Sequence, residues 1–187
     1  MSEVTTSPDS WHSDWLLGTG DHGIAVTELE QGILRFFAAF EMSCEQLSRL
    51  ARADGLKFQE VIVVGVVAMQ RGHPTASSLA RQLNRDDVQN LQYTLRKLVD
   101  NGYLSQSKKT GSRVVTYAVS KKGRKFVTDY FTVRSKLVTK KTGLIEDIDA
   151  KLSGASELIS VLTGLYDGAA MTSSTYSPLY ENRGQHK

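Results

Sequence analysis

The chain has 187 residues and a formal net charge of +3, and its 40% hydrophobic and 23% charged residues are ordinary for a soluble globular protein. No apolar run approaches the roughly 20 residues of a membrane span, and the N-terminal residues lack the basic and apolar stretches of a secretory signal. The charge is uneven: residues 71–141 hold 16 Lys and Arg against 4 Asp and Glu, between acidic flanks, which is typical of a protein that binds nucleic-acid phosphates.

The first part of the chain is predicted to hold a flexible arm and a long helix. Residues 1–22 are polar and without an apolar period, so we expect a flexible arm. Apolar residues recur every three or four positions over residues 25–53, which predicts a helix, and Asp54 and Gly55 would end it. This seam suggests that residues 23–56 are a dimerisation helix. Its members are Val26, Leu29, Ile33, Phe37, Phe40, Cys44, Leu47 and Ala51.

Residues 57–71 are ambiguous between a strand and a helix. The run VIVVGVV within them has strand propensity. The length of the segment and the Gly72 that follows it favour a buried helix instead, and we predict a helix.

A short helix, a tight turn and a longer helix follow. Thr75 is expected to cap a helix over residues 76–82, Asn84 and Arg85 form the turn, and Asp86 or Asp87 caps a helix over residues 88–101. This order is that of a helix-turn-helix, which inserts its second helix into the major groove of DNA.

The second helix of this motif has a polar outer face. Leu91, Leu95 and Leu98 form its buried stripe, and helical geometry places other side chains outside. Gln and Asn side chains can pair with adenine and Arg with guanine, although any surface helix carries such residues and the two interpretations are about even. The outer residues are Gln89, Asn90, Gln92, Tyr93 and Arg96.

A basic hairpin completes the predicted winged helix-turn-helix over residues 57–120. One strand begins at Tyr103 and Leu104, Lys108 and Lys109 lie at the tip, and Arg113 opens the return strand. A positive hairpin beside a recognition helix fits contact with phosphates or the minor groove. The fold class is therefore mainly α with a small β-wing.

Two further helices are predicted at the C-terminal side. Ser120 would cap a helix over residues 121–142, and residues 145–167 form another. We assign residues 121–167 to dimerisation and residues 168–187 to a flexible tail, because two separated apolar seams imply a twofold dimer. The second seam contains Ile145, Ile148, Leu152, Ala155, Ile159, Leu162 and Tyr166. The expected dimer interface comprises Ile33, Phe37, Ile148, Leu152, Ile159 and Leu162.

The segments LRKLVDNGYLSQ (residues 95–106) and RVVTYAVSKKG (residues 113–123) carry a family resemblance. With the order of elements over residues 26–166, the chain resembles the MarR-type transcription regulators. One departure is Gly111, where the family usually has an Asp that steadies the wing Arg.

The resemblance implies a homodimer that binds a pseudo-palindromic double-stranded operator, with affinity often set by a small-molecule effector or an oxidant. It places base reading on Gln89, Asn90, Gln92 and Tyr93, and agrees with the helical geometry. Phosphate contacts fall on Ser77 and Ser78, and wing contacts on Arg113, Lys108 and Lys109. Arg85 and Arg96 complete the predicted DNA-binding set.

Two other hypotheses concern aromatic and sulfur side chains. Phe36, Phe37, Phe40 and Tyr130 are candidates for an effector pocket, with core packing as the favoured alternative for each. Cys44 could be a redox switch, but we favour a small apolar seam residue, because Glu41 and Glu45 would oppose its thiolate. A single cysteine also fits a reducing cytoplasm, where we expect the protein to reside.

No catalytic constellation is recognisable, so we expect neither an enzyme nor a metal or other cofactor. The leading hypothesis is a sequence-specific DNA-binding regulator without membrane association. The alternative is a winged-helix protein-interaction module whose basic face meets an acidic partner.

Overall fold

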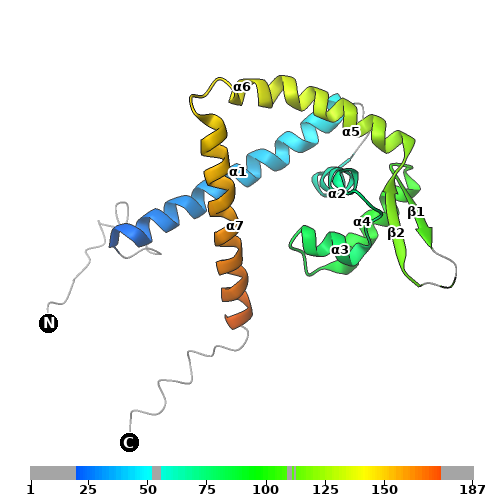
Figure 1. Cartoon of the computed structure of the whole chain (residues 1–187), viewed down its shortest axis with the longest axis horizontal. Helices are drawn as coiled ribbons and strands as arrows, with labels where there is room; N and C mark the ends of the chain where they lie inside the picture. Colours follow the sequence, from blue (N-terminus) through cyan, green and yellow to red (C-terminus); the bar gives the residue numbers. More distant parts are fainter. Residues whose placement is uncertain (1–19, 52–55, 109–110, 112, 174–187) are drawn as a thin grey trace, which may run out of the picture. The chain divides into compact units, whose positions relative to one another are not determined.

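The computed structural model describes residues 20–51, 56–108, 111 and 113–173, which fall into two units divided between Arg134 and Ser135 (Figure 1). The first unit contains α1 (Gly20–Leu50), α2 (Phe58–Met69), α3 (Ala76–Gln82), α4 (Val88–Asp100), β1 (Leu104–Lys108), β2 (Val115–Val119) and α5 (Lys121–Arg134). The second contains the π-helical turn η2 (Ser135–Thr139), α6 (Lys140–Thr142) and α7 (Ile148–Ser173). The predicted class, mainly α with a small β-wing, is confirmed.

Helix α2 lies at the centre of the first unit and packs against α1, α3, α4, α5 and β2 (Figure 1). Val63 and Val64 have no exposed surface. A helix enclosed by so many neighbours needs apolar residues all round, which explains why its sequence is as apolar as a buried strand. The prediction of a helix rather than a strand is confirmed, with bounds one and two residues inside the predicted ones.

The two long helices extend beyond their predicted bounds. Helix α1 begins at Gly20 rather than at residue 25, so the last residues of the expected flexible arm are helical. Helix α7 begins three residues later than predicted and continues to Ser173, so residues 168–173 are not part of a flexible tail. Apolar periodicity misses helical turns that carry few large apolar residues, such as GAAMT after Asp167. The predicted end of the first helix at Asp54 and Gly55, and residues 1–19 and 174–187, lie outside the described residues.

The helix predicted over residues 121–142 is not one regular α-helix. It is α5, followed by a turn of π-helix at η2 and a single turn at α6. Among the described residues, no helix combines the length and the apolar character needed to cross a bilayer.

Candidate nucleic-acid interface

The N-terminus of α3 is held by a reciprocal cap. The Thr75 hydroxyl accepts a hydrogen bond from the Ser78 backbone N–H at 3.1 Å, and the Ser78 hydroxyl accepts one from the Thr75 N–H at 3.0 Å. The predicted Thr75 cap is thus confirmed, and it satisfies two backbone donors that helical geometry leaves unpaired. Ser78, a predicted phosphate contact, is committed to this cap, whereas the neighbouring Ser77 is exposed.

The turn between α3 and α4 lies at Asn84 and Arg85, as predicted. Asn84 adopts a left-handed conformation with φ of 49°, which Asn tolerates better than most residues. The Arg85 N–H donates to the Ala80 carbonyl at 2.9 Å and the Asn84 N–H to the Arg81 carbonyl at 3.2 Å. These two bonds close a Schellman motif that ends α3 and sets the direction of α4.

Arg85 holds this turn together instead of presenting its charge outward. Its guanidinium binds both carboxylate oxygens of Asp87, at 2.7 and 2.6 Å, and Gln59 of α2 at 2.7 Å. The hydrogen bonds from Arg85 hold the pKa of Asp87 down to about 2. Asp87, one of the two predicted caps, occupies the N-cap position of α4, but its carboxylate binds Arg85 and makes no capping hydrogen bond to the helix. The sequence suggested Arg85 as a DNA contact, but its partners here give it a structural role.

Helix α4 is anchored on one side by leucines and by one ion pair between an exposed lysine and a buried glutamate. Leu91, Leu95 and Leu98 have no exposed surface. The Lys97 ammonium lies 2.6 Å from a carboxylate oxygen of Glu60, a residue of α2 that is only 5% exposed. The hydrogen bond with Glu60 raises the pKa of Lys97.

The second carboxylate oxygen of Glu60 accepts the Lys57 backbone N–H at 2.8 Å and caps α2. Glu60 thus joins the start of α2 to α4. Sequence reasoning missed this link, because only the fold brings residues 60 and 97 together. The spacing of Lys57 and Glu60 at N-cap and N3 was the available signal for the cap.

The end of α4 and the start of α5 are in close contact. Gly102, with φ of 75°, ends α4 in a left-handed conformation that favours glycine. The Lys122 ammonium binds the Asn101 carbonyl at 2.9 Å, where the helix end is electronegative. Ser120 accepts the Gly123 N–H at 3.0 Å, which confirms its predicted capping role.

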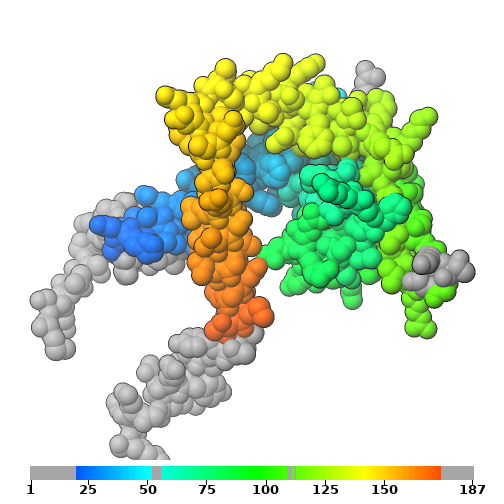
Figure 2. Space-filling model, viewed as in Figure 1, coloured from blue at the N-terminus to red at the C-terminus, as the bar shows by residue number. Residues whose placement is uncertain are grey.

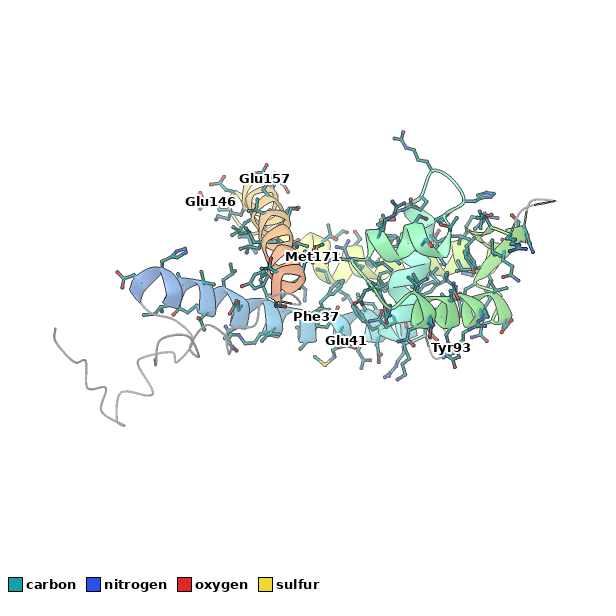
Figure 3. The ribbon with its side chains drawn as sticks, turned by 90° about the horizontal axis from the view of Figure 1, so that it is seen from below. Phe37, Glu41, Tyr93, Glu146, Glu157 and Met171 are labelled. Carbon is teal, nitrogen blue, oxygen red and sulfur yellow. The ribbon has the colours of Figure 1, made fainter. Side chains whose placement is uncertain are left out.

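The opposite side of α4 is open to solvent. Gln89, Asn90, Gln92, Tyr93 and Arg96 are all exposed, and Tyr93 retains 64% of its surface. Figure 3 shows Tyr93 projecting from this outward side of α4. The predicted division between a leucine stripe and a polar outer face is confirmed.

The wing, formed by β1, β2 and the turn between them, is tied to the helix-turn-helix. The strands pair antiparallel, with Leu104 opposite Val119 and Lys108 opposite Val115. The Tyr117 N–H donates to the Pro74 carbonyl at 3.0 Å, and Thr116 forms a bridge with Thr75. These contacts fix the wing beside the N-terminus of α3. Lys109, predicted at the tip, lies outside the described residues.

A groove of about 560 Å³ lies between the start of α3, α4 and the wing, and we call it the α3–α4–wing groove. In Figure 2 the green surfaces of these elements adjoin one another. The groove brings together four of the predicted DNA-binding residues: Ser77, Gln92, Arg96 and Arg113. The positive charge of Arg96 also acts on the buried Tyr117, which places Arg96 near the wing. Donors from three elements thus converge on one surface.

The other predicted contacts lie outside the lining of this groove. Gln89, Asn90 and Tyr93 occupy the same exposed side of α4, and Lys108 is exposed at the end of β1. The Asn90 amide also binds the Asp87 carboxylate at 3.2 Å.

The candidate effector residues have separate packing roles. The Tyr130 hydroxyl donates to the Cys44 sulfur at 3.3 Å, and its ring packs on Phe126. Phe37 and Phe40 of α1 meet Phe58 edge-on, and Phe36 is 69% exposed. Tyr130 is partly buried and packs against the core, whereas Phe36, Phe37 and Phe40 lie exposed on α1.

Cys44 is 1% exposed and belongs to the core. Burial raises the pKa of its thiol, which opposes formation of the reactive thiolate. Both observations favour a packing role for Cys44 over a role as an accessible redox thiol.

The predicted dimer residues are accessible in the single chain. In the first unit Ile33 and Phe37 are 39% and 50% exposed. In the second unit Leu152 and Ile159 are 53% and 51% exposed, and Ile148 and Leu162 are half-buried.

The comparisons with known proteins agree with this geometry. Residues 56–123 match the family model described as a winged helix DNA-binding domain. No curated protein matches the chain.

Several solved structures have a similar fold. A MarR transcriptional regulator from Methanosarcina mazei Go1 is 16% identical, with a TM-score of 0.60 over 75% of this chain and 98% of that one. FabT from Streptococcus pneumoniae, solved in complex with DNA, is 17% identical, with a TM-score of 0.59 over 76% and 98%. The transcriptional regulator BldR from Sulfolobus solfataricus is 17% identical, with a TM-score of 0.56 over 72% and 96%. Residues 56–123 are therefore similar to a winged helix DNA-binding domain, and the chain has the fold of the MarR-type transcriptional regulators.

Proposed function

We propose that the protein is a transcription regulator that binds double-stranded DNA in a sequence-specific manner as a homodimer. The α3–α4–wing groove carries this proposal, because it gathers amide and guanidinium donors on an exposed surface. Gln92 and Arg96 have the chemistry to read base edges in the major groove. Ser77 and Arg113 have the chemistry to hold the phosphates on either side.

The basic charge of the winged helix and its structural similarity to a DNA-bound protein support duplex DNA as the ligand. Positions 71–141 contain 16 basic residues and only 4 acidic ones, which favours a polyanion over a neutral partner. FabT, one of the proteins of similar fold, was solved in complex with DNA.

The apolar seams support the homodimer. Exposed Ile33 and Phe37 in the first unit, and Leu152 and Ile159 in the second, present large apolar surfaces along helices. Large apolar side chains that stay exposed along a helix are a common feature of interfaces. A twofold dimer would present two α4 helices to half-sites about one helical turn of DNA apart, roughly 34–36 Å.

We also propose that a small molecule modulates DNA binding. Of the four aromatic residues expected to form its pocket, Phe36 and Phe37 remain 69% and 50% exposed, and Tyr130 donates a hydrogen bond to the Cys44 sulfur.

The proposal is tested by measuring duplex binding by fluorescence anisotropy on genomic fragments that the protein selects. Arg96→Ala and Gln92→Ala should each weaken binding by about 1–3 kcal/mol and relax sequence preference. Lys125→Ala is the matched control: it removes one positive charge, but its partner is Asp129 within α5. Equal affinity of all four proteins would reject the assigned face. Failure of the wild-type protein to bind duplex DNA at low salt would favour the protein-interaction alternative.

A further inference from the structure

A chain of side-chain hydrogen bonds runs from α2 through the turn before α4 to Asn90, in the first turn of α4. We propose that this chain orients the side-chain amide of Asn90 so that its oxygen faces the DNA. Asn90 then recognises the exocyclic amino group of adenine or cytosine in the major groove. This base preference rests on the proposed function of the protein as a DNA-binding regulator, and it adds which bases α4 selects.

The chain of hydrogen bonds begins on α2, the central helix of the first unit. The Gln59 side-chain oxygen accepts a hydrogen bond from the Nη1 atom of Arg85 at 2.7 Å. The Nε and Nη2 atoms of Arg85 donate to the two carboxylate oxygens of Asp87, at 2.7 and 2.6 Å. A paired contact of this kind is strong and fixes the orientation of the carboxylate. Asp87 therefore presents its Oδ2 atom in a defined position beside α4.

The side-chain amide of Asn90 is oriented by Asp87. Its nitrogen donates to the Oδ2 atom of Asp87 at 3.2 Å. The two ends of an asparagine amide have nearly the same shape, so their partners decide which end faces which way. The hydrogen bonds from Arg85 hold the pKa of Asp87 down to about 2, so at neutral pH its carboxylate can only accept. The nitrogen of Asn90 must face this acceptor, and the oxygen of the exposed amide is left to point away from it.

Base edges in the major groove differ in the group that they offer to an amide oxygen. Adenine and cytosine carry an exocyclic amino group there, whereas guanine and thymine carry a carbonyl oxygen. An oriented amide oxygen accepts a hydrogen bond from the amino group and is repelled by the carbonyl oxygen. An unrestrained asparagine can turn over and donate to the carbonyl instead, so it distinguishes these two classes of base poorly. The hydrogen bond to Asp87 thus supplies the discrimination.

Asn90 lies where a recognition helix contacts bases. It is the third residue of α4, and the N-terminal residues of such a helix are the ones that reach base edges. Successive residues of an α-helix turn by about 100°, which places Asn90 and Gln92 on opposite flanks of the outer face. Of these two side chains, Gln92 lines the α3–α4–wing groove and Asn90 lies outside it. The two side chains should therefore contact different base pairs.

The orientation of the amide is tested without DNA, by NMR spectroscopy of the full chain. We expect the two side-chain N–H signals of Asn90 to shift in Asp87→Asn, because their charged acceptor is lost. Asp86→Asn removes the same charge from the exposed neighbouring residue, so it is the matched control and should leave these signals in place. Asn90 signals that are the same in the wild type and in Asp87→Asn would overturn the orienting hydrogen bond.

The base preference is measured by selecting bound sites from a random duplex library and then substituting each base pair of a half-site in turn. We expect one position at which the wild type prefers adenine or cytosine over guanine or thymine on one strand by about fivefold or more. Asn90→Ala should remove this preference, and Gln92→Ala should act at another position. Asp87→Asn should reduce the preference to less than about twofold at the same position as Asn90→Ala, whereas Asp86→Asn should keep it.

Three results with a wild type that binds duplex DNA would overturn the base preference but keep the proposed function. Loss of a guanine or thymine preference in Asn90→Ala would show that the nitrogen faces the base. No change at any position in Asn90→Ala would show that Asn90 does not read bases. An unchanged preference in a folded Asp87→Asn would show that Asp87 does not orient the amide.

Two further points separate folding and function from the base preference. Asn90→Ala alters an exposed side chain, so it tests the class of base even where Asp87→Asn fails to fold. Absence of duplex binding by the wild type would reject the proposed function together with the base preference.

Discussion

At the residue scale, Gly123 is the described glycine with the least room for an added Cβ atom. A Cβ atom there would lie 2.1 Å from the Tyr103 carbonyl oxygen and 2.8 Å from a methyl of Val119. The first contact is with backbone, which cannot move aside without disturbing the junction of α4 and the wing. Glycine at this position therefore allows the first turn of α5 to pack closely against Tyr103 and Val119.

We predict that Gly123→Ala lowers the free energy of unfolding by about 2 kcal/mol or more, as overpacking of a core does. Gly65→Ala is the control, because a Cβ at that position of α2 has no atom within 4 Å. Since alanine is the better helix former, this control should stabilise by about 0.5–1 kcal/mol. Chemical denaturation measures both, and a neutral effect at Gly123 would contradict the close approach.

The ion pair between Asp87 and Arg85 should make the stability of the protein depend on pH. The folded-state pKa of Asp87, about 2, lies below the ordinary pKa of an aspartate. The pair with Arg85 therefore contributes its full stabilisation at pH values above that ordinary pKa. That contribution declines as the pH falls toward 2. We predict that Asp87→Asn lowers the thermal midpoint at neutral pH and that the difference from wild type shrinks over this acidic range.

Asp86→Asn, at the exposed neighbouring position, is the control for Asp87→Asn and should not reproduce this pH-dependent difference. A thermal midpoint of Asp87→Asn equal to that of wild type at neutral pH would show that the Arg85 pair does not hold the turn.

At the scale of elements, α4 and the wing have different parts in the proposed complex. Gln92 carries a side-chain amide that can distinguish base pairs, whereas Lys108 carries only a charge. We predict that Lys108→Ala weakens binding by a similar factor on every duplex, while Gln92→Ala weakens it most on the preferred sequence. Lys125→Ala again serves as the charge-matched control. Sequence-dependent loss in Lys108→Ala would contradict a phosphate role for the wing.

Most elements of the winged helix could be predicted from the sequence, because their signals are local. Thr75, Gly102 and the leucine spacing of α4 each mark an element by themselves. The links between elements could not be predicted in this way. Glu60 with Lys97, and Tyr130 with Cys44, are pairs that meet only after folding. Arg85 was misleading for the same reason: a basic residue in a turn gives no sign of whether its partner is a phosphate or Asp87.

At the scale of the whole molecule, the proposed dimer depends on apolar seams in both units. Ile33→Glu and Leu152→Glu each place a charge on an exposed seam residue that has little to lose in the single chain. We predict that either change yields a folded protein that sediments as a monomer at micromolar concentration, because a buried unpaired charge is costly in an interface. Gln46→Glu, at an exposed position of α1 outside the seam, is the control. A wild type that sediments as a folded monomer would contradict the dimer.

The proposed binding of DNA phosphates is tested by the salt dependence of duplex binding by the full chain. We predict that log affinity falls linearly and steeply with log salt, because each neutralised phosphate releases counterions. Arg113→Ala should reduce the slope by about 1, as the loss of one phosphate contact does. Lys125→Ala should leave the slope unchanged. Absence of binding to duplex DNA at low salt, or an affinity independent of salt, would contradict a DNA-binding function for this protein.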